Sequence, residues 1–335
     1  MSETTKKSVS NADPTIRKAG RRFVKVFDQF IAFAAAIALF VFFSIVARNF
    51  FTVRSVLSLA LQTSAVTLMG IGVTFTIITG GIDLSIGSVV ALSGTVAVMV
   101  AIAGVPIWIS MLIGLLVGAA CGLLNGLMIT KLKLPPFIAT LGMMMVARGV
   151  ALTITNAAAY PAPEGFGELG NGTIFGTGPE FPGIPYPVLV MIGVALFLHF
   201  LLSTTRIGRY TYAVGSNEEA ARLSGVNVHR VKIINYIISA TLAALVGVIL
   251  ASRMITSQPN SAIGYEMNAI AAAVIGGSSL MGGVGTVGGT VIGSFIIGIL
   301  TVGLTMSGAN YFMQQIVIGL VVIGAVIVDQ LRGRK

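Results

Sequence analysis

Residues 107–130 decide the fold: they read IWISMLIGLLVGAACGLLNGLMIT and contain no charged side chain. An α-helix of this length rises about 36 Å, whereas about 20 apolar residues suffice to cross the ~30 Å hydrocarbon core of a bilayer. Gly114, Gly118, Gly122 and Gly126 recur at every fourth position and share one helix face, on which a second helix can approach closely. The stretch therefore predicts a membrane-spanning helix that packs against another helix.

The composition of the whole chain is that of a membrane protein. Of its 335 residues, 55% are hydrophobic and 10% are charged, whereas a soluble domain carries about 25% charged residues. Because so little polar surface cannot solvate a globule of this size, we expect the lipid bilayer to cover much of the chain. The single cysteine, Cys121, lies inside an apolar stretch and excludes an intrachain disulfide.

Ten apolar stretches are candidates for crossing the membrane. They are 29–47, 56–79, 86–103, 107–130, 137–156, 187–203, 233–252, 267–280, 287–306 and 311–329. The first is too long for the apolar core of a signal peptide and is expected to be a retained span. The eighth is short and is expected to be a broken or re-entrant segment. None shows the alternation of apolar and polar residues that barrel strands require.

The sequence therefore predicts an all-α, polytopic membrane helix bundle with about ten transmembrane helices. We divide it into a basic cytoplasmic segment, 1–28, and a single transmembrane domain, 29–335. Residues 14–28 have apolar side chains on one helical face, so they form either an interfacial helix on the inner leaflet or a disordered basic tail. Residues 157–187 hold six of the eleven prolines and are expected to be an irregular, exposed loop without a core.

The positions of the basic residues predict the orientation of the chain. If the N-terminus is cytoplasmic and the ten stretches alternate, the inner segments hold 17 basic residues and the outer segments hold three, Arg48, Arg54 and Arg253. Cytoplasmic loops of membrane proteins carry such an excess of Lys and Arg. The net charge of +10 is thus explained without nucleic acid as a partner, and both termini are expected in the cytoplasm.

The longest expected cytoplasmic segment, 204–232, contains the signals of a short helix. Ser216 followed by Glu219 fits a capping box that starts a helix, with two glutamates in its positive first turn. Arg222 lies near the negative end, and Gly225 is placed to end the helix. Because a two-turn helix is marginal in water, we expect it to hold its shape best when docked on a partner. The alternative is an ordinary solvated loop.

This segment resembles the cytoplasmic coupling segment of ABC importer permeases. The resemblance rests on EEAARLSGV at 218–226 and on RIGRY at 206–210, which is similar to ribose-type permeases. Further matching stretches are TGGIDLSIGS at 79–88, PFIATLG at 136–142, GYEMNAIAA at 264–272 and GGSSLMGG at 276–283. The resemblance runs from about residue 30 to the C-terminus and identifies the family more firmly than the substrate.

The resemblance implies the membrane-spanning subunit of an ATP-driven importer in the bacterial inner membrane. The family pairs two permeases, either two copies or a copy and a paralogue. A cytoplasmic ATP-binding subunit docks on the coupling helices, and a periplasmic binding protein delivers a monosaccharide, ribose being favoured. The residues expected to couple to the ATPase are Ser216, Glu218, Glu219, Ala220, Arg222, Leu223 and Gly225. The chain has no G-x-x-x-x-G-K-[ST] phosphate loop, so ATP and magnesium are expected in the partner and no cofactor here.

Ionisable residues inside the membrane are expected to have a structural or functional role, because a charge there is energetically unfavourable. The residues expected to line the translocation pathway are Gly80, Gly81, Asp83, Ser85, Glu266 and Asn268. The alternative is that Asp83 caps the helix starting near Leu84, and that Glu266 and Asn268 cap the eighth span. Arg148 is expected to pair with a carboxylate or with backbone carbonyls.

Two other function classes are weighed against the importer permease. An ion-coupled secondary transporter of a small polar solute would need embedded acids, for which Asp83 and Glu266 are the candidates. A membrane enzyme would need a nucleophile–base or metal constellation, which the sequence does not contain. We therefore expect no catalytic residue and no metal site. Hydropathy alone does not distinguish a transporter from a channel. Within the sugar class, other pentoses, galactose-like sugars, inositol and an autoinducer sugar stay open beside ribose.

Overall fold

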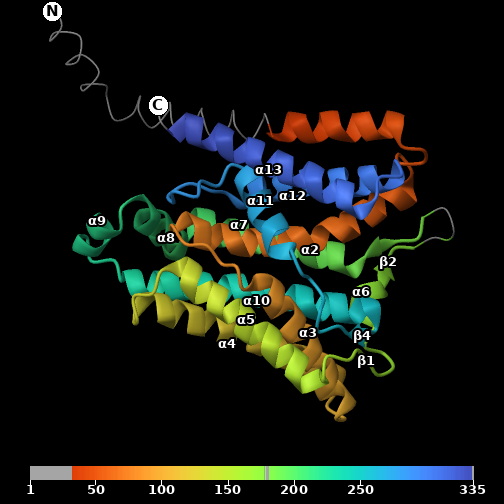
Figure 1. Cartoon of the computed structure of the whole chain (residues 1–335), viewed down its shortest axis with the longest axis horizontal. Helices are drawn as coiled ribbons and strands as arrows, with labels where there is room; N and C mark the ends of the chain where they lie inside the picture. Colours follow the sequence, from red (N-terminus) through yellow and green to blue (C-terminus); the bar gives the residue numbers. More distant parts are fainter. Residues whose placement is uncertain (1–31, 177, 179–180, 334–335) are drawn as a thin grey trace, which may run out of the picture.

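The computed structural model describes residues 32–176, 178 and 181–333. The basic segment 1–28, with the predicted interfacial helix at 14–28, lies outside the described residues. Figure 1 shows a bundle of helices that run roughly side by side, with short helices and strands at the two ends of the bundle.

An apolar helix lies at each of the ten predicted stretches. They are Ala32–Val46, α2 (Val53–Ile78), α3 (Ile86–Ile102), α4 (Ile107–Thr130), α5 (Pro136–Thr155), α7 (Tyr186–Thr204), α10 (Val228–Met254), α11 (Tyr265–Ile275), α12 (Val287–Met306) and α13 (Tyr311–Gly333). Among the described residues, six of these (α2, α4, α5, α7, α10 and α12) are long and apolar enough to cross a membrane. A multi-pass helical membrane protein is therefore confirmed, whereas ten crossings stay a prediction.

Helix α10 lies at the centre of the bundle and packs against α2, α3 and α4 (Figure 1). The glycines that recur along α4 form its contact with α10: a Cβ on Gly118 would overlap Ala244, and a Cβ on Gly122 would overlap the carbonyl oxygen of Tyr236. The predicted close approach of a second helix is confirmed, because no side chain larger than hydrogen fits at these positions.

The eighth stretch is broken, as expected. Its helix, α11, has 11 residues and begins at Tyr265, after an irregular segment, 258–264, that contains left-handed backbone at Ala262 (φ 56°) and Gly264 (φ 84°). Helix α11 ends earlier than predicted, at Ile275, because Gly277 adopts a φ of 89° that stops the helix.

The prediction that 157–187 has no core is wrong. Strand β1 (Tyr160–Pro161) pairs with β4 (Thr256–Ser257), and β2 (Thr173–Ile174) pairs with β3 (Ile184–Pro185), on either side of the short helix α6 (Glu168–Asn171). Phe166 is fully buried in a cluster with Val98 and Val248 of α3 and α10. The loop therefore folds over the ends of these helices.

Replacing Gly122 by alanine is expected to weaken the bundle. The added methyl group would meet the Tyr236 carbonyl, and overpacking of this kind costs about 1–3 kcal/mol. Gly149→Ala is the matched control, since a Cβ there meets nothing within 4 Å. Thermal unfolding of the detergent-purified protein should show a lower midpoint for Gly122→Ala alone, and equal midpoints would contradict the packing.

Candidate functional site

Two helices outside the apolar stretches, α8 (Arg206–Ser216) and α9 (Glu218–Leu223), lie together at one end of the bundle, on the left in Figure 1. The predicted short helix is confirmed as α9, but its start is not. Asn217 caps α9, accepting a hydrogen bond at 2.9 Å from the Ala220 amide, while Ser216 is the last residue of α8. The capping box predicted at Ser216 is therefore wrong, because the next residue is an equally good cap.

The predicted stop of α9 at Gly225 is confirmed. Gly225 has a φ of 82°, and its amide donates to the Arg222 carbonyl at 3.0 Å. The next amide, of Val226, donates to the Ala221 carbonyl at 3.1 Å, which completes a Schellman motif. Helix α9 is thus closed at both ends by its own residues.

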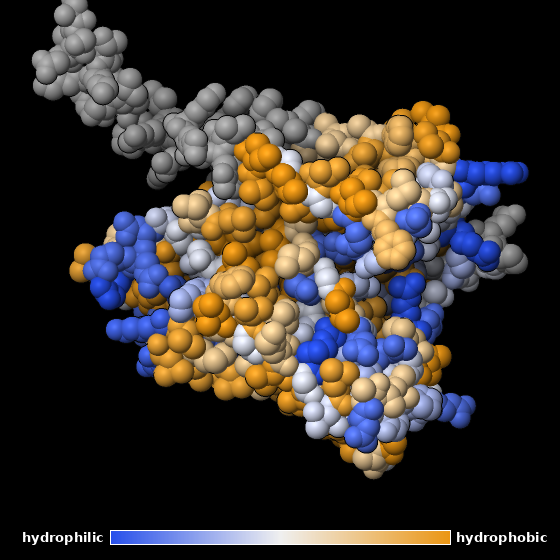
Figure 2. All heavy atoms as spheres, viewed as in Figure 1, coloured by the Kyte–Doolittle hydropathy of each residue, from blue (hydrophilic) through white to orange (hydrophobic). Residues whose placement is uncertain are grey.

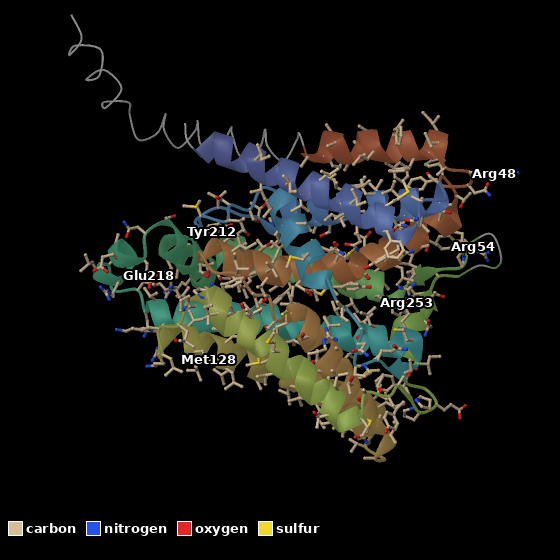
Figure 3. The ribbon with its side chains drawn as sticks, in the orientation of Figure 1. Arg48, Arg54, Met128, Tyr212, Glu218 and Arg253 are labelled. Atoms are coloured by element: carbon tan, nitrogen blue, oxygen red, sulfur yellow. The ribbon has the colours of Figure 1, made fainter. Side chains whose placement is uncertain are left out.

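The side chains of α9 divide into a packed side and an exposed side. Ala221 is buried against Val214 of α8 and against Val228 and Val231 of α10. Leu223 is 80% exposed at a hydrophilic end of the molecule (Figure 2). The exposed charges are paired: Glu218, labelled in Figure 3, contacts Lys232 at 2.6 Å, and Glu219 contacts Arg222 at 2.5 Å. The exposed side of α9 therefore offers one apolar side chain surrounded by ordered charges.

Helix α8 joins α9 to the inner part of the bundle through a contact that we call the glycine junction, formed by Ile78, Gly215 and Gly283. A Cβ on Gly215 would overlap the Ile78 carbonyl oxygen, which also accepts a hydrogen bond from the Gly283 amide at 2.8 Å. Beside it, the Tyr212 hydroxyl donates to the Gly285 carbonyl at 2.6 Å. Burial raises the pKa of Tyr212 to about 12, so this hydroxyl keeps its proton at physiological pH. Helix α8 is thereby fixed to the end of α2.

Asp83 lies in the break between α2 and α3 and is fully buried. Its carboxylate accepts hydrogen bonds from the Ser85 amide at 3.0 Å, the Ser85 hydroxyl at 2.6 Å and the Ser239 hydroxyl at 2.9 Å. Asn125 of α4 donates to the Ser85 hydroxyl at 2.9 Å. These four residues, the Asp83 node, connect the break to α4 and α10. The N-cap of α3 is Ser85 and not Asp83, and the Ser85 side chain makes no capping hydrogen bond.

Arg148 of α5 supports the irregular segment before α11. Its guanidinium donates to the carbonyl oxygens of Pro259 at 2.7 Å, Ser261 at 2.8 Å and Gly87 at 3.3 Å. Of the two expected partners, backbone carbonyls are therefore the ones found. Backbone that is not helical at membrane depth needs such partners, since no water satisfies its carbonyl groups there.

A cavity of about 340 Å³ opens among α2, α10, α11, α12 and α13. Its lining includes Arg253, which Figure 3 labels on the same side of the molecule as Arg48 and Arg54, away from Glu218. The polar residues that line it are Gln62, Thr63, Ser64, Arg253, Tyr265, Asn268, Thr301, Tyr311, Gln314 and Gln315. Its volume lies within the ~300–1,000 Å³ of small-molecule sites.

The structure does not bring the predicted pathway residues together. Asn268 lines the cavity, but Glu266 does not. The Glu266 carboxylate lies so close to Gly87 that a Cβ on Gly87 would overlap it. The other predicted pathway residues are Gly80, Gly81, Asp83 and Ser85, and none of these is in the lining. Residues two apart on a helix point about 200° apart, which explains why Glu266 and Asn268 differ.

Sequence comparisons show what this chain is similar to. The family described as "Branched-chain amino acid transport system / permease component" matches residues 55–326. The ribose import permease protein RbsC of Escherichia coli (strain K12) is 43% identical over 298 residues, 88% of this chain and 92% of that protein. RbsC of Bacillus subtilis (strain 168) is 41% identical over 301 residues, 90% and 92% of the two chains. The L-arabinose transport system permease protein AraH of E. coli (strain K12) is 36% identical over 328 residues, 98% of each.

Arg148→Met is expected to destabilise the bundle. It leaves the carbonyls of Pro259 and Ser261 without their charged donor, and an unsatisfied buried group costs about 1–3 kcal/mol. Arg54→Met makes the same change at an exposed position and serves as the control. A thermal midpoint in detergent that falls equally in both variants would contradict the role assigned to Arg148.

Proposed function

Because the chain belongs to the family of branched-chain amino acid transport system permease components, we propose that it is the membrane-spanning subunit of an ATP-driven importer of a monosaccharide, with ribose favoured. The names of its relatives favour a sugar over an amino acid: they are import or transport permeases for ribose, L-arabinose and D-allose. The identity of more than 40% with two ribose permeases is the observation that carries the proposal. The chain is a transport subunit and not an enzyme.

The architecture proposed for this subunit has all ten apolar helices crossing a bacterial inner membrane, with both termini in the cytoplasm. The excess of basic residues around α8, α9 and the other predicted inner segments supports this orientation. Helix α13 runs towards the same end of the bundle as α9 in Figure 1, in agreement with a cytoplasmic C-terminus. The cavity then opens on the periplasmic half.

The partners proposed are three. A cytoplasmic ATP-binding subunit, which carries ATP and magnesium, docks on α9, and the exposed Leu223 on a preorganised helix supports this assignment. A periplasmic sugar-binding protein delivers the sugar at the opposite end, near Arg54 and Arg253. A second permease, as a homodimer or with a paralogue, completes the membrane part of the importer.

Movement of the ATP-binding subunits is proposed to reach the membrane domain through the glycine junction. Helix α9 packs on α8, α8 meets the end of α2 at Gly215, and Tyr212 holds the segment that leads into α12. At Gly215 the backbone of α8 lies directly against the Ile78 carbonyl, with no side chain between them. A displacement of α9 is therefore passed to α2 rather than absorbed.

Reconstitution tests the function directly. The permease, its ATP-binding subunit and its binding protein in proteoliposomes should take up radiolabelled D-ribose only when ATP is present with the ATP-binding subunit. Uptake driven by a proton or sodium gradient without an ATPase would contradict the proposal and favour an ion-coupled transporter.

Leu223→Asp is expected to weaken docking of the ATP-binding subunit. Loss of an apolar anchor at an interface costs about 1–2 kcal/mol, or roughly tenfold in affinity. Leu223→Met keeps the apolar contact and should bind as the unchanged chain does. The measurement is the affinity of the ATP-binding subunit for the permease in nanodiscs, by surface plasmon resonance. Undiminished binding to Leu223→Asp would exclude Leu223 from the interface.

Gly215→Ala is expected to uncouple ATP hydrolysis from transport. The methyl group would push α8 away from Ile78 while leaving α9 exposed and able to dock. Gly193→Ala on α7 is the control, because its Cβ meets nothing within 4 Å. The number of sugars transported per ATP hydrolysed should fall for Gly215→Ala only; an unchanged ratio would show that the glycine junction does not transmit movement.

A further inference from the structure

The N-terminus of α11 lies within the bundle and faces the cavity. The segment ahead of it is held near Gly87 by Arg148, so α11 begins part of the way along the neighbouring helices. Its N-cap is Gly264, which has no side chain to cap the helix, and Gly264, Tyr265 and Asn268 all line the cavity. The first amides of a helix and its dipole favour an electronegative atom at this end.

A second, independent feature of the cavity is the hydroxyl of Thr63. This side chain is 1% exposed, and its Oγ1 has no hydrogen-bond partner within the described part of the chain. It lies against Gly298, which also lines the cavity. Buried hydroxyls without partners are rare in folded proteins, and such a group indicates a missing partner.

The rest of the lining determines which kind of partner fits. None of the described lining residues is Asp, Glu or Lys, and one of them, Arg253, is an arginine. The remaining polar residues are amides and hydroxyls, which both donate and accept hydrogen bonds. A cavity with these groups suits an uncharged solute that carries several hydroxyls.

We propose that this cavity is a low-affinity subsite for a monosaccharide, in which Thr63, Asn268 and the N-terminus of α11 bind sugar hydroxyls on the way through the permease. The identity of the solute rests on the proposed function. The subsite receives the sugar after the binding protein releases it. Few direct contacts and one orphan hydroxyl give millimolar affinity, which allows the sugar to leave towards the cytoplasm.

Thiol protection tests the subsite in the full chain. Gln315→Cys places a thiol on the exposed lining, while the native Cys121 is buried. With a Kd of about 10 mM, ~50 mM D-ribose should slow labelling by a methanethiosulfonate reagent about sixfold in nanodiscs without the binding protein. Glycine betaine at the same concentration should give no protection. Equal protection by both solutes, or by neither, would overturn the proposal.

Variants in the Gln315→Cys background locate the bound sugar. Thr63→Val and Asn268→Leu should each reduce the protection by ribose, whereas Thr63→Ser keeps a hydroxyl and should retain it. Thr67→Val is the matched control, because Thr67 lies one turn along α2, is buried with an equally unpartnered hydroxyl, and is not in the lining. Loss of protection in Thr67→Val to the same degree would overturn the assignment to Thr63.

The two proposals fail separately. ATP-dependent ribose uptake without any protection by ribose would leave the importer function standing and remove the subsite. Protection by ribose in a chain that supports no ATP-dependent uptake would leave the subsite standing and remove the importer function.

Discussion

The need to satisfy backbone groups away from water is the constraint on which the rest of this structure depends. Two non-helical stretches inside the bundle are the break between α2 and α3 and the segment 258–264 before α11. Each is supported by an ionisable side chain, the fully buried Asp83 and the partly buried Arg148. Asp83 accepts from hydroxyls of its own break and of α10, while Arg148 donates to three carbonyls. Because both side chains are held by these hydrogen bonds, we assign them a structural role in the two breaks.

The two ends of the bundle differ in structure. At one end the cavity opens among polar side chains of α2, α11, α12 and α13. At the other, α8 and α9 contact the end of α2 through Gly215 and Ile78. Helix α2 runs between them: Thr63 lies in its first half, beside the cavity, and Ile78 is its last residue. Helix α2 thus links the proposed subsite at one end to the glycine junction at the other, as the proposed coupling requires.

What the sequence could predict followed from local patterns. Uninterrupted apolar stretches located all ten apolar helices, and Gly225 with Arg222 located the end of α9. What it could not predict depended on distant partners. Ser239 lies 156 residues from the carboxylate it bonds, so the local sequence indicated a pathway or capping role for Asp83 but not its link to α10. Ser216 and Asn217 are adjacent and equally good helix caps, so the sequence could not show which of them starts α9. The core of the loop at 157–187 depends on the contact of Phe166 with α3 and α10, which are distant in the sequence.

The closed ends of α9 have an evolutionary consequence. Asn217 caps the start of the helix, Gly225 ends it, and Ala221 anchors it to its neighbours. The shape is therefore fixed by these three positions, whereas Leu223 and the paired charges lie on the exposed side of the helix. Under the proposed docking on α9, substitutions at the outward positions can change which ATP-binding subunit is recognised while the scaffold is inherited intact. Related permeases in one cell can thus diverge in partner choice without passing through a misfolded ancestor.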